Sequence, residues 1–186
     1  GFASFMGGKF SEDTYEYIGY DDEISFSEDT MVGIQIGSEL SDKINVTAQL
    51  TAKGSEDYDI EAALAFMTYA VNDDWDIRLG RIRAPFFYYS EFLEVGYAYP
   101  WVRPPSEVYG RIPFDSFEGI DTLYRSNHGD WSATWHAFYG NNNEDLDADG
   151  ESLELDLTNF WGANVTIGND WLTLRAGYLQ ADVTQE

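Results

Sequence analysis

Residues 43–53 alternate strictly between apolar and polar side chains, and this pattern constrains the fold more than any other feature of the sequence. Five apolar side chains share one phase: Ile44, Val46, Ala48, Leu50 and Ala52. Every intervening residue from Lys43 to Lys53 is polar or charged. Successive side chains of a strand point to opposite faces, so one face of this strand is apolar and the other is wet. A half-buried strand of a soluble sheet and a membrane-crossing strand both have this pattern.

Other segments between turn-forming residues also favour strands. Strands are expected at residues 30–40, 59–71, 75–81, 120–125, 131–139, 159–168 and 171–180, with a short aromatic segment at 1–10. Turns rich in Asn, Asp, Ser and Gly separate several of them, at residues 41–42, 72–74, 126–130 and 169–170. We therefore expect an all-β, antiparallel chain of about nine strands in a single domain, residues 1–186.

The connections between these strands alternate in length. Four are the short turns named above, whereas residues 11–29, 82–119 and 140–158 form long connections and residues 54–58 a modest one. Short turns on one side and long loops on the other are typical of transmembrane β-barrels. Aromatic residues also gather near the strand ends, where amphipathic rings favour a bilayer interface: Trp75, Trp131, Tyr139, Trp161, Trp171 and Tyr178. These features predict an antiparallel transmembrane β-barrel of the bacterial outer membrane.

The composition excludes two other classes of protein. The chain has 34 acidic and 10 basic residues, a formal net charge of −24, which disfavours binding to nucleic acid phosphates. No apolar run approaches the ~18–20 residues of a transmembrane helix. The mean hydropathy of −0.38 is compatible with a barrel, because a barrel needs apolar residues only at alternate positions. The sequence has no cysteine, so it forms neither a disulfide nor a thiolate metal site.

The number of expected strands suggests a larger barrel. Single-chain bacterial barrels close with an even number of strands, and nine is odd. The polar residues 181–186 would also leave an unpaired strand edge, which lipid does not tolerate. We therefore expect these residues to be the N-terminal half of a 16-stranded barrel.

All five prolines lie within residues 84–114, so this segment is not expected to form a membrane strand. The segment is nevertheless rich in Phe, Tyr and Trp, and it is too aromatic to extend into water. We therefore expect it to fold against the wall of a wide lumen, which is the surface available to it.

The stretches 78–90 and 95–109, which begin with Arg78-Leu79-Gly80-Arg81, resemble the Gram-negative general porins of the 16-stranded trimeric superfamily. The likeness is most specific within residues 75–125 and mainly architectural elsewhere. It implies a homotrimer in the outer membrane, in contact with the lipid bilayer and lipopolysaccharide, through which ions and small hydrophilic solutes diffuse passively. It also implies that residues 84–114, which follow the fifth expected strand, fold inward and constrict the pore, with acidic loop residues facing arginines of the wall.

The residues expected at this constriction come from the wall and from the loop. The wall offers Arg78, Arg81, Arg83 and Arg125, with Arg175 as a further candidate. The loop offers Glu91, Glu94, Arg103, Glu107, Arg111 and Asp115. Arg103 and Arg111 depart from an all-acidic loop, which leaves the selectivity open. Opposed charges across a lumen create a transverse field that orients polar solutes.

One acidic segment has the carboxylate spacing of a calcium-binding loop. Its candidate ligands are Asp145, Asp147, Asp149, Glu151 and Asp156. Flanking helices are not expected, and the twelfth position is Asp rather than Glu. A solvated acidic loop tip is the alternative, and no cofactor is required by the expected function.

Catalysis has little support from the sequence. No nucleophile elbow or metal-binding motif surrounds His128 or His136, and the Glu91/Glu94 pair lies among prolines and aromatics. We therefore expect a protein that is not an enzyme. Two alternatives remain open: a secreted β-sandwich that binds carbohydrate, and a sugar-specific channel with an aromatic track formed by Tyr88, Tyr89, Tyr97, Tyr99, Trp101 and Tyr109.

Overall fold

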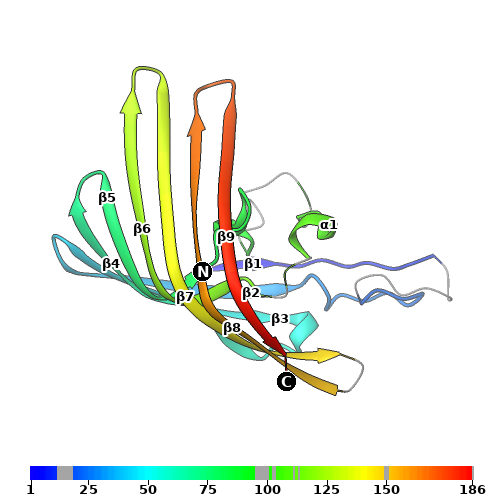
Figure 1. The fold of residues 1–186 in the computed structure, drawn as a ribbon. Helices are drawn as coiled ribbons and strands as arrows, with labels where there is room; N and C mark the ends of the chain where they lie inside the picture. Colours follow the sequence, from blue (N-terminus) through cyan, green and yellow to red (C-terminus); the bar gives the residue numbers. More distant parts are fainter. Residues whose placement is uncertain are drawn as a thin grey trace.

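A computed structural model describes residues 1–11, 19–94, 101, 104–110, 112, 114–148 and 151–185. Within them, nine strands form one antiparallel sheet in which each strand pairs with its neighbour in sequence (Figure 1). The strands are β1 (Phe2–Ser4), β2 (Met31–Ser41), β3 (Ile44–Lys53), β4 (Ile60–Asn72), β5 (Trp75–Arg83), β6 (Ser116–His128), β7 (Trp131–Ala148), β8 (Glu151–Gly168) and β9 (Thr173–Gln185). The short helices are η1 (Gly54–Glu56), η2 (Ser90–Phe92) and α1 (Ser106–Tyr109).

The strand register sorts the side chains onto two faces. Residues that are directly paired share a face, and Ala48 pairs with Ile36 on one side and Ala65 on the other. Farther along the sheet, Leu79 pairs with Ile120. We call the side that carries these residues the outer face. The phase expected for β3 is confirmed, since its apolar residues Ile44, Val46, Ala48 and Leu50 all lie on the outer face.

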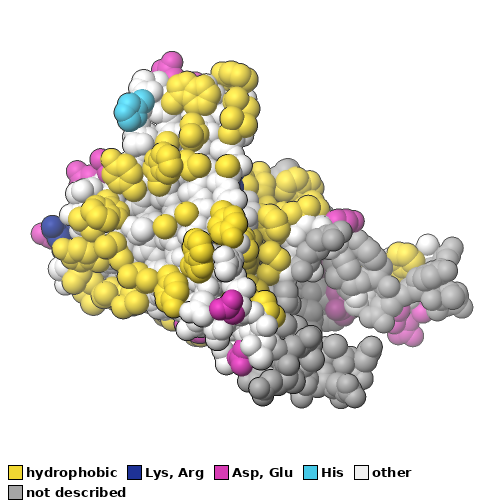
Figure 2. All heavy atoms as spheres, in the orientation of Figure 1, with side chains coloured by type: hydrophobic (Ala, Val, Ile, Leu, Met, Phe, Trp, Pro, Cys, Tyr) yellow, Lys and Arg dark blue, Asp and Glu magenta, His cyan; other side chains and the backbone are white. Residues whose placement is uncertain are grey.

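The outer face is mainly apolar, and no described residue covers it. Figure 2 presents one side of the molecule, on which hydrophobic side chains spread over the strands. Large apolar residues from β2 to β9 are between 45 and 60% exposed on the outer face: Ile34, Ile36, Leu79, Ile120, Trp135 and Leu174. A folded chain that leaves so extended an apolar surface open requires an apolar environment or a partner.

The opposite side of the sheet, the inner face, carries the buried core. Phe117, Phe138 and Phe160 from three consecutive strands are almost fully buried there, with Phe114 from the segment that precedes β6. The rings of Phe138 and Phe160 lie 4.8 Å apart, and Phe86 packs on both Phe114 and Phe160. The core therefore holds both ends of the connection between β5 and β6, at Phe86 and Phe114, against the inner face.

Residues 84–115, called the inserted segment below, touch strands that are far apart in the sheet. Glu94 contacts Gln49 of β3, while the carbonyl oxygen of Pro85 accepts a hydrogen bond from Arg175 of β9. A single short segment reaches both strands because the sheet curves around it (Figure 1). The two ends of the segment meet, since the Ala84 amide donates to the Asp115 carbonyl oxygen at 2.8 Å.

The predicted fold class is confirmed: the structure is an antiparallel, nine-stranded, all-β sheet with very little helix. Short turns join β2 to β3, β4 to β5, β6 to β7 and β8 to β9, as expected. The long loop predicted at residues 140–158 is wrong. Most of these residues extend β7 and β8 into an 18-residue pair, whose register continues from Asn142↔Leu157 to Ala148↔Glu151. Backbone pairing with a partner strand has overridden the weak strand preference of Asn and Asp.

No helix in the described part of the chain is both long enough and apolar enough to cross a membrane.

Candidate functional site: a charged inner face beneath the inserted segment

Arg78 links the wall to the inserted segment. Strand alternation places it on the inner face of β5, opposite the phase of Leu79. Its Nε donates to Asp121 of β6 at 2.9 Å, and its Nη2 reaches Glu91 of η2 at 3.2 Å. Its guanidinium also lies over the ring of Phe66, 5.5 Å from the centroid. One arginine therefore holds a wall carboxylate, Asp121, and a segment carboxylate, Glu91, together.

Asp121 is the buried centre of this cluster. Its side chain is fully buried, and besides Arg78 it contacts the Nε2 of His136 on β7 at 2.8 Å. Both contacts arise from register, because Asp121 pairs with Arg78 on one side and on the other with Phe138, which lies two residues from His136. Two cationic or donor groups on one carboxylate compensate for its removal from water.

Arg83 forms a second cluster at the end of β5. Its Nη2 lies 2.8 Å from the carboxylate of Glu94, and its Nη1 contacts Asp115. Glu94 also accepts a hydrogen bond from the side chain of Gln49. Gln49 was expected to face water, but it is buried beneath the inserted segment. The polar side of β3 thus supports this segment instead of being wet along its whole length.

Two further predicted wall arginines lie apart from these clusters. Arg125 pairs with Asp76 at 2.8 Å near the short-turn end of β5 and β6, where both groups are partly exposed. Arg81 pairs with Glu118 at 3.2 Å. Because Arg81 shares the phase of Leu79, and Glu118 that of Ile120, this pair lies on the outer face. The structure therefore does not bring Arg81 together with Arg78.

The remaining predicted constriction residues belong to the inserted segment. Glu107 lies on α1 and is exposed. Arg103 and Arg111 lie outside the described residues. Of the predicted set, the structure brings together Arg78 with Glu91, and Arg83 with Glu94 and Asp115.

The candidate calcium residues lie on a β-hairpin rather than on a loop. Asp145 and Asp147 belong to β7, and Glu151 and Asp156 to β8, while Asp149 lies outside the described residues. Glu151 pairs with Ala148, which lies three residues from Asp145 on β7. At ~3.3 Å per residue, the backbones of Asp145 and Glu151 are therefore about 10 Å apart along the strand direction. A calcium loop instead wraps its ligands around one point. The expected loop geometry is corrected, and calcium binding itself stays a prediction.

Sequence reasoning missed Asp121, Gln49 and the role of His136. Each of the three lies on an expected strand, and the alternation of side chains along that strand could have assigned it to the inner face. Their contacts depend on the register between strands and on the path of the inserted segment, which the spacing of residues along the chain does not encode.

No family model matches the chain, and no curated protein matches it. Among solved structures, a loop L8 deletion mutant of OmpT, an outer membrane protein of Vibrio cholerae, is similar at a TM-score of 0.37 and 8% sequence identity. The alignment covers 89% of this chain and 65% of that protein. An outer-membrane location is also the one expected for this chain from its sequence.

The expectation that the chain is not an enzyme is corrected. The inner face holds a buried histidine–aspartate pair, His136 and Asp121, which no sequence motif signals. A missing catalytic motif therefore does not exclude catalysis, and that exclusion is withdrawn.

Proposed function

We propose that this chain forms the wall of a water-filled channel in the bacterial outer membrane, through which ions and small hydrophilic solutes diffuse passively. The observation that carries the proposal is the opposite chemistry of the two faces. Ile36, Leu79 and Ile120 are exposed on the outer face, while charged side chains and the inserted segment occupy the inner face. Lipid outside and water inside match this division.

The inserted segment supplies the constriction of the proposed channel. It is anchored to the inner face by the phenylalanine core and by the ion pairs of Arg78 and Arg83. Buried ion pairs and packed rings hold a segment in one position more firmly than exposed contacts do. The segment therefore narrows the lumen permanently rather than as a mobile lid.

The partners of the channel follow from its surfaces. The outer face lies against the bilayer, and in a homotrimer part of it lies against a neighbouring copy. The β7–β8 extension and the long connections lie at the opposite end of the sheet from the short turns. In bacterial barrels this end is external. We place lipopolysaccharide around it.

The rivals from the sequence are less well supported. A soluble β-sandwich needs a second layer on its apolar face, and no described residue covers the outer face. An aromatic track for sugars needs neighbouring rings whose flat faces are exposed to the solute and lie roughly parallel to one another. The rings of Tyr88 and Tyr89 are perpendicular, as are those of Tyr89 and Trp101, so these rings pack edge-on against one another. Tyr97 and Tyr99 lie outside the described residues.

Liposome swelling tests the proposal. Vesicles reconstituted with the full chain should admit a pentose quickly, a disaccharide more slowly and a large dextran not at all. Vesicles prepared without protein are the control. A chain that is monodisperse in buffer without detergent and leaves the vesicles impermeable to the pentose would contradict the proposal.

A further inference from the structure

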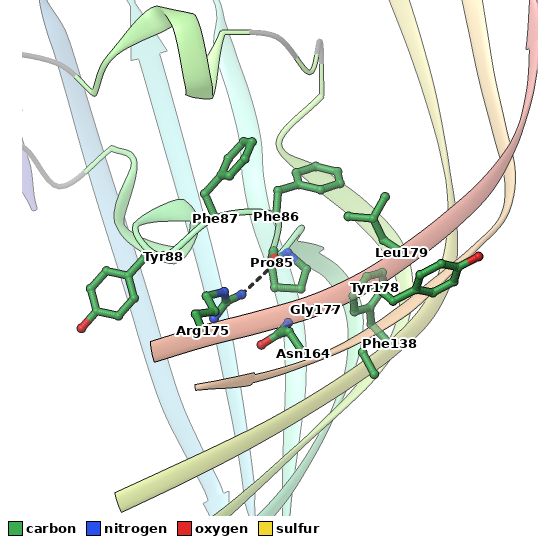
Figure 3. Close-up of a pocket in the computed structure, with 11 residues that line it drawn as sticks. Pro85, Phe86, Phe87, Tyr88, Phe138, Asn164, Arg175, Gly177, Tyr178 and Leu179 are labelled. Carbon is green, nitrogen blue, oxygen red and sulfur yellow. Dashed lines mark hydrogen bonds between the residues drawn. The ribbon is translucent and has the colours of Figure 1, made fainter. Parts of the chain in front are cut away.

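A cavity of about 280 Å³ lies between the start of the inserted segment and strands β7 to β9 (Figure 3). It is smaller than the ~300–1,000 Å³ of sites for drug-sized ligands, so it suits a compound with a single ring or a short chain. The side chains of Arg175 from β9 and Asn164 from β8 lie on its sheet side, and Phe86 and Phe87 lie on its segment side.

Arg175 differs from the other arginines that the structure describes. Arg78, Arg81, Arg83 and Arg125 each pair with a carboxylate. Arg175 instead donates to Thr166 Oγ1 at 3.0 Å and to the Pro85 carbonyl oxygen at 2.8 Å, and no described carboxylate forms an ion pair with it. A guanidinium has five N–H donors. Glu91 of the inserted segment attracts this guanidinium without forming an ion pair with it, so Arg175 keeps several donors available to the cavity.

A second polar group beside the cavity lacks a partner. The Nδ2 of Asn164 is buried and forms no hydrogen bond within the described part of the chain. A buried donor without an acceptor costs about 1–3 kcal/mol. Asn164 and Arg175 lie on neighbouring strands, where Asn164 pairs with Gly177, the next inward residue after Arg175. Both groups thus offer donors to the same cavity.

The rest of the lining is mainly apolar or aromatic and contains no acidic side chain, although the chain as a whole carries a net charge of −24. Its apolar and aromatic members include Phe86, Phe87, Tyr88, Phe138, Tyr178 and Leu179. Donors and a positive charge recognise a carboxylate, and the surrounding rings favour an apolar body over water.

We propose that this cavity binds small monocarboxylates with an aromatic or apolar body, held by Arg175 and Asn164. The proposal deepens the proposed function and rests on it, because a solute reaches the inner face through the lumen. The channel then concentrates such acids next to its constriction, against the repulsion of its acidic surface.

Calorimetry on the purified full chain in detergent tests the site with benzoate, benzamide and acetate as probes. Benzoate should bind at least about tenfold more tightly than benzamide, which lacks the charge, and than acetate, which lacks the ring. Equal binding of benzoate and benzamide would overturn the role of Arg175. Equal binding of benzoate and acetate would overturn the role of the rings.

Two variants probe the donors. Arg175→Gln should weaken benzoate binding about tenfold or more, whereas Arg81→Gln on the outer face should leave it unchanged. Asn164→Leu, which spares the Arg175 contact with Pro85, should also weaken it and keeps the test valid if Arg175→Gln fails to fold. Unchanged binding in both folded variants, or in Asn164→Leu alone when Arg175→Gln is unfolded, would overturn the proposal.

Swelling of vesicles in the pentose separates this proposal from the proposed function. Permeable vesicles with no benzoate binding would overturn the carboxylate site and leave the channel standing. Impermeable vesicles would overturn the channel, and the calorimetric comparison in detergent would still decide whether the cavity holds a carboxylate.

Discussion

The Nη2 of Arg83 lies 2.8 Å from the carboxylate of Glu94, and the two side chains are only 4 and 7% exposed. This pair joins the last residue of β5 to the part of the inserted segment that reaches across to Gln49 on β3. The position of the segment on the inner face therefore depends on a buried contact rather than on loop stiffness.

Replacing Glu94 by Leu should destabilise the protein by about 3 kcal/mol, because Arg83 then keeps only Asp115 as a partner for a buried charge. Glu91→Leu is the matched control. Glu91 is more exposed, and Arg78 retains Asp121, so its loss should cost less than about 1 kcal/mol. Urea unfolding in detergent micelles measures both. Equal losses would mean that the Arg83 pair does not anchor the segment.

Deleting residues 88–108 should raise the single-channel conductance in planar bilayers, if the inserted segment constricts the lumen as proposed. A deletion within residues 145–154, at the tip of the β7–β8 extension, is the control. It also shortens a connection between two strands, and it should leave the conductance nearly unchanged. Unchanged conductance after the first deletion would place residues 88–108 outside the conducting path.

Replacing Ala48 by Arg should cost roughly 2–4 kcal/mol if Ala48 lies near the bilayer midplane, because its side chain faces outward. Replacing the neighbouring Thr47 by Arg should be close to neutral for stability and should alter permeation. Unfolding from lipid vesicles gives the two free energies. The reverse ranking would mean that the outer face does not contact lipid.

Single cysteines at residues 44–51 give an independent measure of the two faces, since the native chain contains no cysteine. A membrane-impermeant thiol reagent should label positions 45 and 47 in preference to 44, 46 and 48. Position 49 should label slowly, because Gln49 is buried beneath the inserted segment. Uniform labelling along the strand would contradict a lipid-facing outer side.

The channel should prefer cations modestly at low salt. The 34 acidic residues outnumber the 10 basic ones and raise the local cation concentration within a Debye length of the mouth, ~8 Å at physiological ionic strength. The preference should weaken as salt rises, because screening shortens this length. Reversal potentials in a potassium chloride gradient measure it, and anion selectivity at low salt would contradict it.

Alternation predicted the strands well because burial of one face imposes a period of two on the sequence. The expected strand at 30–40 is β2 shifted by one residue, and the strand at 75–81 is β5 shortened by two. Residues 140–158 were predicted to be a loop because they are rich in Asn and Asp, which favour turns. Their pairing in β7 and β8 is set by the partner strand, which local composition does not report.

The candidate site was only partly predictable. Arg78, Glu91, Arg83 and Glu94 were named because the resemblance to general porins implies paired charges at a constriction, and each forms an ion pair in the structure. Arg81 was grouped with Arg78, although three residues along a strand reverse the face. The contact between Asp121 and His136 was not foreseen, because it needs the register of β6 against β7.

The hydrogen bond between Ala84 and Asp115 joins the first and last residues of the inserted segment. The end of β5 and the start of β6 are therefore held together independently of the residues between them. We expect the pairing of β5 with β6 to survive changes in the length of the segment, because this hydrogen bond joins its two ends. In the proposed channel, grafting a foreign sequence between these two residues is therefore a route to new pore sizes.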